Sequence, residues 1–324
     1  MTDIRSIQVT GDRTIALTSL PSAAALGEFE VRGSTLASLI SPGTELASAF
    51  APADPAAVAY PKSIGYSSVF RIEEIGASVT KHAVGDLVFS TGPHQSQQTE
   101  HENRAIPVPA GLDPTVAVFA RIIAVPAAAL ITTNARPGDR VGIVGLGLVG
   151  HLGAKAFRAS GYRVTAWDPV AERRSGLGEG IRVLESPVLD DPEDVFEIVV
   201  DASGHDGATV QAARVTAKNG ELVLTGTPWA KRTDASAHEL LHLIFHRYLH
   251  VRSGWEWQLP VEPADFRQGS VLSNFRLALD WLSRGDITVE GLSQTVSPED
   301  AQRVFTALAE RSEGPLTYVF DWTR

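Results

Sequence analysis

Three glycines in the middle of the chain have the spacing of a phosphate-binding turn. Gly145, Gly147 and Gly150 form a Gly-x-Gly-x-x-Gly pattern directly after the apolar run 141–144. The first glycine of such a pattern allows a tight turn, the second lets the backbone approach a pyrophosphate, and the third lets the next helix pack closely on the sheet. The amino end of that helix offers free N–H groups and a positive dipole end to phosphates. The pattern therefore predicts a dinucleotide-binding βαβ unit whose helix spans residues 148–160.

An acidic residue ends the second strand of this unit. Asp168 follows the β-type run 163–167, about twenty residues after the first glycine of the turn. A carboxylate at this place accepts hydrogen bonds from a ribose 2′-hydroxyl and repels a 2′-phosphate, which favours NAD(H) over NADP(H). Arg173 and Arg174 lie nearby, and because guanidinium groups attract phosphate, NADP(H) stays open as the cofactor.

Two later turns follow the apolar runs 196–200 and 220–224. Ligands of an open parallel sheet sit beyond the carboxyl ends of its strands, so the turns 201–204 and 225–227 are expected to border the cofactor. Plain connecting turns are the alternative interpretation. The predicted cofactor-binding residues are Gly145, Gly147, Leu148, Val149, Gly150, Asp168, Arg173, Ser203, Gly204, Thr225, Gly226 and Thr227.

The composition narrows the class of protein. The chain has 324 residues, 44% hydrophobic and 20% charged, as in a globular protein large enough for two domains. A net charge of −10 disfavours binding to nucleic acid or anionic membranes, so a small molecule is the expected partner. The absence of cysteine excludes disulfides, thiolate nucleophiles and thiolate metal ligands. No signal-peptide core and no uninterrupted apolar run of ~20 residues is present, so we expect a cytoplasmic protein.

Two kinds of pattern divide the chain. Residues 1–119 show short alternating runs broken by proline and glycine, which is typical of a β-rich domain. Residues 120–258 alternate helical and strand runs in the manner of a doubly wound parallel sheet. The final apolar run 316–322 has no sheet of its own, so we expect residues 259–324 to return to the first domain. The predicted fold class is α/β with a second, β-rich and discontinuous domain.

This order of domains resembles the medium-chain dehydrogenase/reductase superfamily. The resemblance covers nearly the whole chain, and the segments that carry it include Gly65-Tyr66, Val84-Gly85-Asp86, Pro107-Val108-Pro109 and Pro137-Gly138-Asp139. It implies a GroES-like catalytic domain, a Rossmann nucleotide-binding domain and an NAD(P)-dependent oxidoreductase. It also implies a homodimer, formed through the edge strand of the nucleotide domain near residues 248–253.

Zinc-binding members of that superfamily hold the metal at three places. These are a cysteine in an Ile-Cys-x-Ser/Thr-Asp motif, the histidine of a Gly-His-Glu motif, and a later cysteine or acid. Here the first place falls in Ile40–Glu45, the second reads Gly65-Tyr66, and the third falls near residues 120–121. The four-cysteine structural lobe is missing as well, and residues 94–99 occupy its region. The resemblance therefore implies a zinc-independent member without metal ligands.

A closer resemblance is to the bacteriochlorophyllide a dehydrogenase subgroup. Its members carry Ile-Ser-x-Gly-Thr-Glu, Gly-Tyr, Glu-Trp and a carboxyl-terminal Leu-Asp-Trp, and they oxidise a hydroxyethyl side chain to acetyl with NAD. The matching segments are Ile40–Glu45, Gly65-Tyr66, Glu256-Trp257 and Phe320-Asp321-Trp322. The second motif departs from the subgroup at Ser67, where the subgroup has glutamate.

Without zinc, side chains must polarise the substrate and move its proton. Tyr66 suits this task as an acid for ketone reduction, because a phenol has an unperturbed pKa of about 10, and it acts as a base only if a cation lowers that pKa. Lys62, four residues earlier, is the candidate cation. The resemblance gives Thr44 the role of hydroxyl relay, Glu45 would orient the relay, and Ser41 would donate to the substrate oxygen. Filling of the vacated metal pocket is the alternative role for Tyr66.

One motif indicates a different class of protein. His238, Glu239 and His242 fit His-Glu-x-x-His, which on a helix places two imidazoles on one face for zinc, with the glutamate as base. His246 and His250 continue the four-residue spacing. No further ligand is identifiable and the segment falls inside the nucleotide domain. A helix face that bears histidines, with at most an adventitious metal, is therefore the favoured interpretation over a zinc hydrolase.

Together the patterns favour a zinc-independent, NAD(H)-preferring oxidoreductase that interconverts a secondary alcohol and a ketone. Reduction of an activated C=C bond and nucleotide binding without catalysis remain as alternatives. Trp229, Trp255 and Trp257 lie near the expected cleft and indicate an aromatic or bulky substrate, although packing accounts for them equally well.

Overall fold

The structure, a computed structural model, describes residues 3–21, 24–51, 59–188, 194–310 and 314–324. The chain forms two compact units, which consist of residues 1–121 with 278–324 and of residues 122–277. We expected the nucleotide-binding unit to end at residue 258, but it extends to Leu277. The reason is that the segment after residue 258 packs on this unit, where Gly269 lies so close to Ile131 that a methyl group on the glycine would be 2.7 Å from that side chain.

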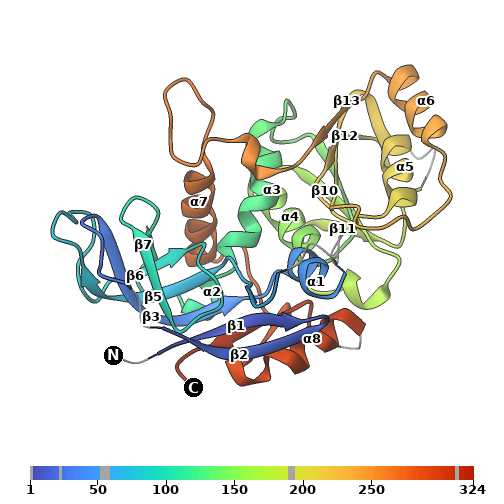
Figure 1. Ribbon diagram of the computed structural model, residues 1–324. Coiled ribbons are helices and arrows are strands. Elements are labelled where there is room, and N and C mark those ends of the chain that lie inside the picture. Colours follow the sequence, from blue (N-terminus) through green and yellow to red (C-terminus); the bar gives the residue numbers. More distant parts are fainter. Residues whose placement is uncertain (1–2, 22–23, 52–58, 189–193, 311–313) are drawn as a thin grey trace. The chain divides into compact units, whose positions relative to one another are not determined.

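The first unit is built mainly from antiparallel strands (Figure 1). One sheet has the order β2–β1–β4, and the other has the order β15–β16–β3–β5–β6–β8, with β7 also paired to β3. The strands are β1 (Ile4–Gly11), β2 (Thr14–Leu20), β3 (Glu30–Leu39), β4 (Lys62–Ser63), β5 (Ser68–Ile75), β6 (Leu87–Ser90), β7 (Gln97–His101), β8 (Ile106–Pro107), β15 (Ser293–Val296) and β16 (Thr317–Asp321). The last strand, β16, pairs antiparallel with β3, so the carboxyl-terminal tail completes this sheet.

Helix α1 (Pro42–Phe50) follows β3 closely, carries the predicted catalytic residues Thr44 and Glu45, and has Ser41 as its N-cap residue. Proline at the first helical position suits the helix, because its fixed φ is helical and its missing N–H would have no intrahelical partner. Ala49 belongs to a core formed with β1, α8 (Ala301–Glu310) and β16, and Leu46 and Phe50 of the same helix pack against it. The short helix α2 (Pro114–Ala117) lies near the end of the unit's first segment.

The second unit contains a six-stranded sheet whose neighbouring strands are all parallel. Its order is β11–β10–β9–β12–β13–β14, which is the Rossmann order with the first strand at the centre. The strands are β9 (Arg140–Val144), β10 (Arg163–Trp167), β11 (Ile181–Leu184), β12 (Phe196–Asp201), β13 (Thr216–Leu224) and β14 (His250–Ser253). The helices are α4 (Leu148–Ala159), α5 (Asp206–Val215) and α6 (Ala237–Arg247), while α3 (Ala120–Thr132) and α7 (Val271–Arg284) extend across the boundaries between the units.

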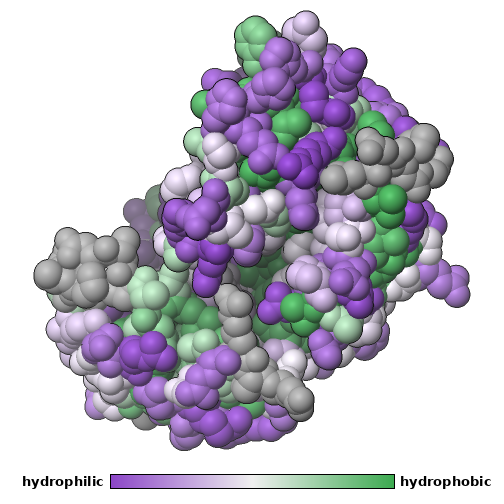
Figure 2. Space-filling model, turned by 90° about the vertical axis from the view of Figure 1, so that its right-hand side faces the viewer, coloured by the Kyte–Doolittle hydropathy of each residue, from purple (hydrophilic) through white to green (hydrophobic). Residues whose placement is uncertain are grey.

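The segment Pro114–Thr132 is long and apolar enough to cross a membrane by length and composition alone, although Arg121 interrupts its apolar run. Its most apolar window has a mean hydropathy of 2.0, and 67% of that window is buried inside the protein. Because most of this window is buried, the segment is packed like the core helix of a globular protein. On the face of the molecule shown in Figure 2, hydrophilic residues are interspersed with smaller hydrophobic patches.

Candidate functional site

The three glycines of the phosphate-binding pattern differ in what surrounds them. Gly145 has a φ of +80°, and a methyl group on it would lie 2.8 Å from the Cα of Ser203. A methyl group on Gly150 would lie 1.8 Å from the carbonyl oxygen of Gly145. Around Gly147, by contrast, none of the described residues beyond its chain neighbours and its own helix backbone has an atom within 4 Å of the place a methyl group would take. The two outer glycines are thus required by the fold, whereas the middle one leaves open space at the amino end of α4.

Helix α4 begins directly after this open glycine. Gly147 is its N-cap residue, with an extended backbone and no side chain to bond the first N–H groups. Leu148 is buried and Val149 is half-buried in the first turn. The free N–H groups of this turn can therefore bind an anion such as a pyrophosphate.

The two predicted turns at the ends of β12 and β13 pack against each other. Gly204 has a φ of +61°, and a methyl group on Gly226 would lie 2.4 Å from its nitrogen. The amides of Thr225 and Gly226 both donate to the Asp201 carbonyl oxygen, at 2.8 and 2.7 Å. Gly204 also approaches Thr227, because a methyl group on the glycine would lie 2.7 Å from the Thr227 carbonyl oxygen. With Ser203 against Gly145, the structure brings these predicted cofactor residues to one edge of the sheet.

One buried hydroxyl of this cluster is unsatisfied. The Oγ1 atom of Thr225 has no hydrogen-bond partner among the residues that the structure describes. Buried hydroxyl groups in proteins are nearly always hydrogen-bonded. An orphaned donor and acceptor beside the glycine turn fits a bound ligand with polar groups, as a dinucleotide has.

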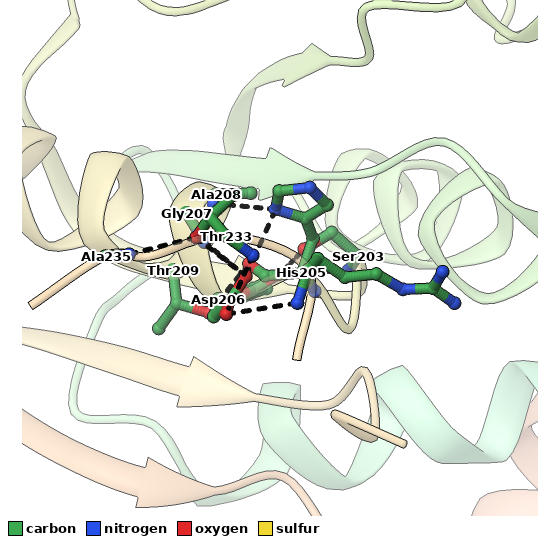
Figure 3. A network of polar contacts seen from close by, with 10 residues as sticks. Ser203, His205, Asp206, Gly207, Ala208, Thr209, Thr233 and Ala235 are labelled. Carbon is green, nitrogen blue, oxygen red and sulfur yellow. Dashed lines mark hydrogen bonds and ion pairs between the residues drawn. The ribbon is translucent and has the colours of Figure 1, made fainter. Parts of the chain in front are cut away.

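The turn that leads into α5 is tied to the loop before α6 by Asp206 (Figure 3). Its carboxylate accepts hydrogen bonds from the amides of Gly207, Arg232 and Thr233 and from the Thr233 hydroxyl, at 3.0 to 3.2 Å. Partial desolvation raises the pKa of Asp206, but the bonds from Thr233 and the other amides outweigh it and hold the pKa at about 2. This tie contributes stability above the ordinary aspartate pKa and loses it only as the pH falls through about 2.

Asp168 lies at the end of β10, where it was predicted, but it is almost fully buried. Its Oδ2 accepts a hydrogen bond from the Leu146 amide and its Oδ1 accepts one from the Val170 amide, both at 2.8 Å. The Arg173 guanidinium approaches Oδ2 at 3.7 Å. The carboxylate therefore also holds the glycine turn in place, and Arg173 is placed to reach a phosphate near the same carboxylate.

We expect Asp168→Asn to narrow the difference between the affinities for NADH and NADPH. The amide keeps an oxygen acceptor for one backbone N–H but removes the negative charge that repels a 2′-phosphate. The ratio of the dissociation constant for NADPH to that for NADH, measured by fluorescence titration, should fall about tenfold, or about 1.4 kcal/mol. The matched variant Arg173→Gln should move the ratio the other way, and an unchanged ratio in both would mean that the ribose is recognised elsewhere.

The predicted catalytic residues of the first unit gather around Tyr66. Its phenol is hydrogen-bonded by the side chains of Ser41 and Thr44, and the Arg121 guanidinium lies over its ring, 4.7 Å from the centroid. Burial and the charge of Glu45 raise the pKa of Tyr66 above its ordinary value of 10.0. The phenol is therefore protonated at neutral pH and is suited to give a proton rather than to take one.

Lys62 does not take the position that we expected beside Tyr66. It lies in β4, where its Nζ donates to Ser48 Oγ at 2.7 Å. A spacing of four residues brings side chains together on a helix but not in an extended segment. The cation at Tyr66 is instead Arg121, and the pKa of Tyr66 is raised by burial and by the charge of Glu45, so the condition under which the phenol would act as a base is not met.

Sequence reasoning missed the partner of Glu45. The Glu45 carboxylate is buried, and its Oε2 lies 3.0 Å from Nε2 of His94, which is fully buried. Its other oxygen accepts a hydrogen bond from the Ser41 amide at 2.7 Å. No local signal points to this pair, because 49 positions separate the two residues.

The residues at the three metal positions do not fit zinc. Ser41, Tyr66 and Arg121 meet at one place, and they offer a hydroxyl, a phenol and a guanidinium. A guanidinium has no acceptor atom, and zinc sites in proteins use thiolate, imidazole or carboxylate ligands. In the part of the chain that the structure describes, no group of three or more His, Cys, Asp or Glu is placed to hold a metal.

The histidine motif lies on α6. His238, His242 and His246 are exposed on successive turns, and the rings of His242 and His246 have centroids 4.1 Å apart. Glu239, the residue that would act as base in a metalloprotease, forms an ion pair with Arg214. The motif is therefore an exposed helix face whose glutamate has a structural partner.

No protein-family model matches the chain. A curated relative, glucose 1-dehydrogenase of Metallosphaera sedula, is 28% identical over 186 residues, which cover 56% of this chain and 48% of that protein. The chain thus matches about half the length of its curated relatives.

Solved structures resemble the chain over nearly its full length. Galactitol-1-phosphate dehydrogenase of Escherichia coli matches with a TM-score of 0.80 at 16% identity, covering 98% of this chain and 99% of that one. Acetophenone reductase of Geotrichum candidum, in complex with NAD, matches with a TM-score of 0.78 at 17% identity, covering 98% of this chain and 97% of that one. At these identities the likeness shows the fold, and it confirms the predicted α/β class with a GroES-like and a Rossmann unit.

Proposed function

We propose that this chain, which has the fold of the medium-chain dehydrogenases/reductases, is an NAD(H)-dependent oxidoreductase that reduces a ketone to a secondary alcohol without zinc. The observation that carries the proposal is the half-buried Tyr66, whose pKa is raised by desolvation, at the place where zinc-dependent members would hold their metal. The curated relative and the structural neighbours are dehydrogenases and reductases, and one neighbour is a reductase of acetophenone.

In this proposal the first unit supplies the proton. Reduction of a ketone creates an alkoxide, which needs a proton donor and a stabilising charge. Tyr66 gives its proton to the developing alkoxide, and the buried Arg121 over its ring stabilises the phenolate that remains. Ser41 and Thr44 bond to the phenol, and since Thr44 is exposed, its hydroxyl returns a proton from solvent to Tyr66.

The second unit binds the cofactor in this proposal. The open space at Gly147 and the free N–H groups of α4 receive the pyrophosphate, Asp168 and Arg173 discriminate at the ribose, and the Thr225 hydroxyl gains a partner. When bound, NADH supplies the hydride. A preference for NAD(H) follows from the charge of Asp168.

The proposed substrate is an aromatic or bulky ketone. Trp229, Trp255 and Trp257 of the second unit expose 54%, 67% and 51% of their surface. Exposed aromatic side chains bind flat apolar groups well, since they lose little conformational freedom on contact. The resemblance to bacteriochlorophyllide dehydrogenases, with a hydroxyethyl substituent on a large ring system, stays a prediction of the sequence.

We also propose that the protein is cytoplasmic and that two copies pair through the nucleotide-binding unit. Strand β14 is an edge strand of the parallel sheet, as the resemblance requires. An edge strand presents unpaired backbone groups to a partner. Beside it, Tyr248 is 73% exposed.

The pH profile of ketone reduction tests the role of Tyr66. Because its pKa is raised, the donor form persists above pH 10, so we expect kcat for reduction by the chelator-treated protein to stay level from neutral pH to beyond that value. Oxidation of the alcohol requires the phenolate and should accelerate with pH over the same range. A fall of the reduction rate near neutral pH would assign the proton to another group, and loss of activity on chelation would show that a metal is needed.

A further inference from the structure

We propose that His94 is a positioning residue for the proton donor, fixed in one tautomer by Ser38 and Trp322 so that it holds the Glu45 carboxylate on the backbone of Ser41. The kinetic part of this inference rests on the proposed function. The structural part does not, since it concerns only the direction of hydrogen bonds inside the first unit.

The direction of these hydrogen bonds follows from the donors and acceptors available. Trp322 Nε1 lies 2.9 Å from Ser38 Oγ, and an indole N–H only donates. The Ser38 hydroxyl hydrogen then has His94 Nδ1, at 2.8 Å, as its acceptor, and within the described residues no other acceptor is in reach of it. Nδ1 therefore carries no hydrogen, and Nε2 donates to Glu45 at 3.0 Å. The alternative, a doubly protonated His94, would leave the buried Ser38 hydrogen without an acceptor.

The imidazole cannot rotate out of this arrangement. Its ring meets Phe320 edge-on at a centroid distance of 5.1 Å, and a methyl group on Gly65 would lie 2.6 Å from its Cδ2 atom. The His94 backbone is held on both sides, because its amide donates to Ile64 and its carbonyl oxygen accepts from Ile7, both at 2.9 Å. A buried histidine fixed this tightly presents its Nε2–H in one direction only.

Glu45 connects His94 to Tyr66 through the start of α1. One carboxylate oxygen takes the hydrogen bond from His94 and the other takes the Ser41 amide, at the start of α1. The Ser41 side chain in turn bonds to the Tyr66 phenol. The titratable groups that face Glu45 are His94 and Tyr66, and the charge that faces Tyr66 from α3 is Arg121. The result is a chain of contacts from Trp322, near the carboxyl terminus, to the proposed proton donor.

Three variants test this chain. His94→Leu removes the donor to Glu45 at similar volume, His94→Gln keeps an N–H donor, and Ser38→Ala removes only the group that selects the tautomer. We expect His94→Leu to lower kcat about 10- to 100-fold, with KM and NADH affinity unchanged. His94→Gln should restore most of kcat, because its side-chain N–H can still donate to Glu45.

Two NMR readouts need no turnover. The ¹⁵N spectrum of histidine-labelled wild-type protein should show His94 as the neutral Nε2–H tautomer, and Ser38→Ala should lose this preference. The Ser41 amide should exchange with solvent faster in His94→Leu than in wild type or His94→Gln. A doubly protonated or Nδ1–H His94, or equal Ser41 exchange in all variants, would overturn the inference even if ketone reduction is confirmed. If the wild type reduces no ketone, the proposed function fails while the NMR result still decides this inference.

Discussion

Replacing Tyr66 with phenylalanine should lower kcat for ketone reduction at least about 100-fold while NADH binding persists. The substitution removes one hydroxyl from a side chain whose ring is already packed under Arg121, so the pocket keeps its shape. What is lost is the proton donor, and general acid catalysis contributes about 10²- to 10⁴-fold to such reactions. The measurement is the steady-state rate of NADH oxidation with an aryl ketone, together with fluorescence titration of NADH.

A tyrosine outside the proposed site provides the control. Tyr248, at the carboxyl end of α6, is 73% exposed, and Tyr248→Phe should leave kcat and NADH affinity unchanged. If Tyr66→Phe turned over as fast as wild type, Tyr66 would only fill the pocket, which is the alternative that its position in the sequence left open.

Replacing Gly147 with alanine should weaken NADH binding strongly without destabilising the protein. Gly147 has a φ of −68°, which alanine adopts freely, and no non-neighbouring atom of the described residues lies within 4 Å of the added methyl group. The methyl group would instead occupy the space through which a pyrophosphate approaches the backbone. We expect the dissociation constant for NADH to rise at least about tenfold, or about 1.4 kcal/mol, and Tm to stay within a few degrees of wild type.

Two other glycines make this test specific. Gly150→Ala would press a methyl group to 1.8 Å from the Gly145 carbonyl oxygen and should lower Tm as well as affinity. Gly11→Ala adds a methyl group at ordinary contact distance from Thr14 in the other unit and should change neither. Unchanged NADH affinity in Gly147→Ala would show that the dinucleotide does not lie on this turn.

The nucleotide-binding unit could be predicted from the sequence because its signals are local. The strands at 141–144 and 163–167 and the helix from Leu148 appear in the structure within about one residue of their predicted bounds. Buried parallel strands are short and uniformly apolar, and a turn that needs a positive φ selects glycine, so each element leaves its own mark on the sequence.

The surroundings of Tyr66 could be predicted only in part. Ser41, Thr44 and Glu45 are neighbours at the start of α1, and the family resemblance was enough to predict that they act together with Tyr66. Long-range packing decides the rest. Arg121 reaches Tyr66 from another helix, and His94 reaches Glu45 across 49 positions, which no periodicity records.

The failed prediction for Lys62 has a related cause. Its spacing of four residues from Tyr66 assumes a helix, and the segment is instead extended and turns at Gly65, which has a φ of +95°. Asp168 lies at the end of β10 as predicted, but its buried bonds to backbone amides could not be read from its position in the sequence, and its ribose-binding role stays a prediction.

The most direct test of the proposed reaction follows a labelled hydride. Metal-stripped protein, with its metal content verified, is incubated with an aryl enone and NADH that carries deuterium at the transferable position. We expect deuterium on the carbinol carbon of a secondary alcohol, formed without added zinc. Deuterium on the β-carbon of a saturated ketone would show instead that the protein reduces C=C bonds. No transfer despite NADH binding would contradict ketone reduction and would identify a nucleotide-binding protein without catalysis.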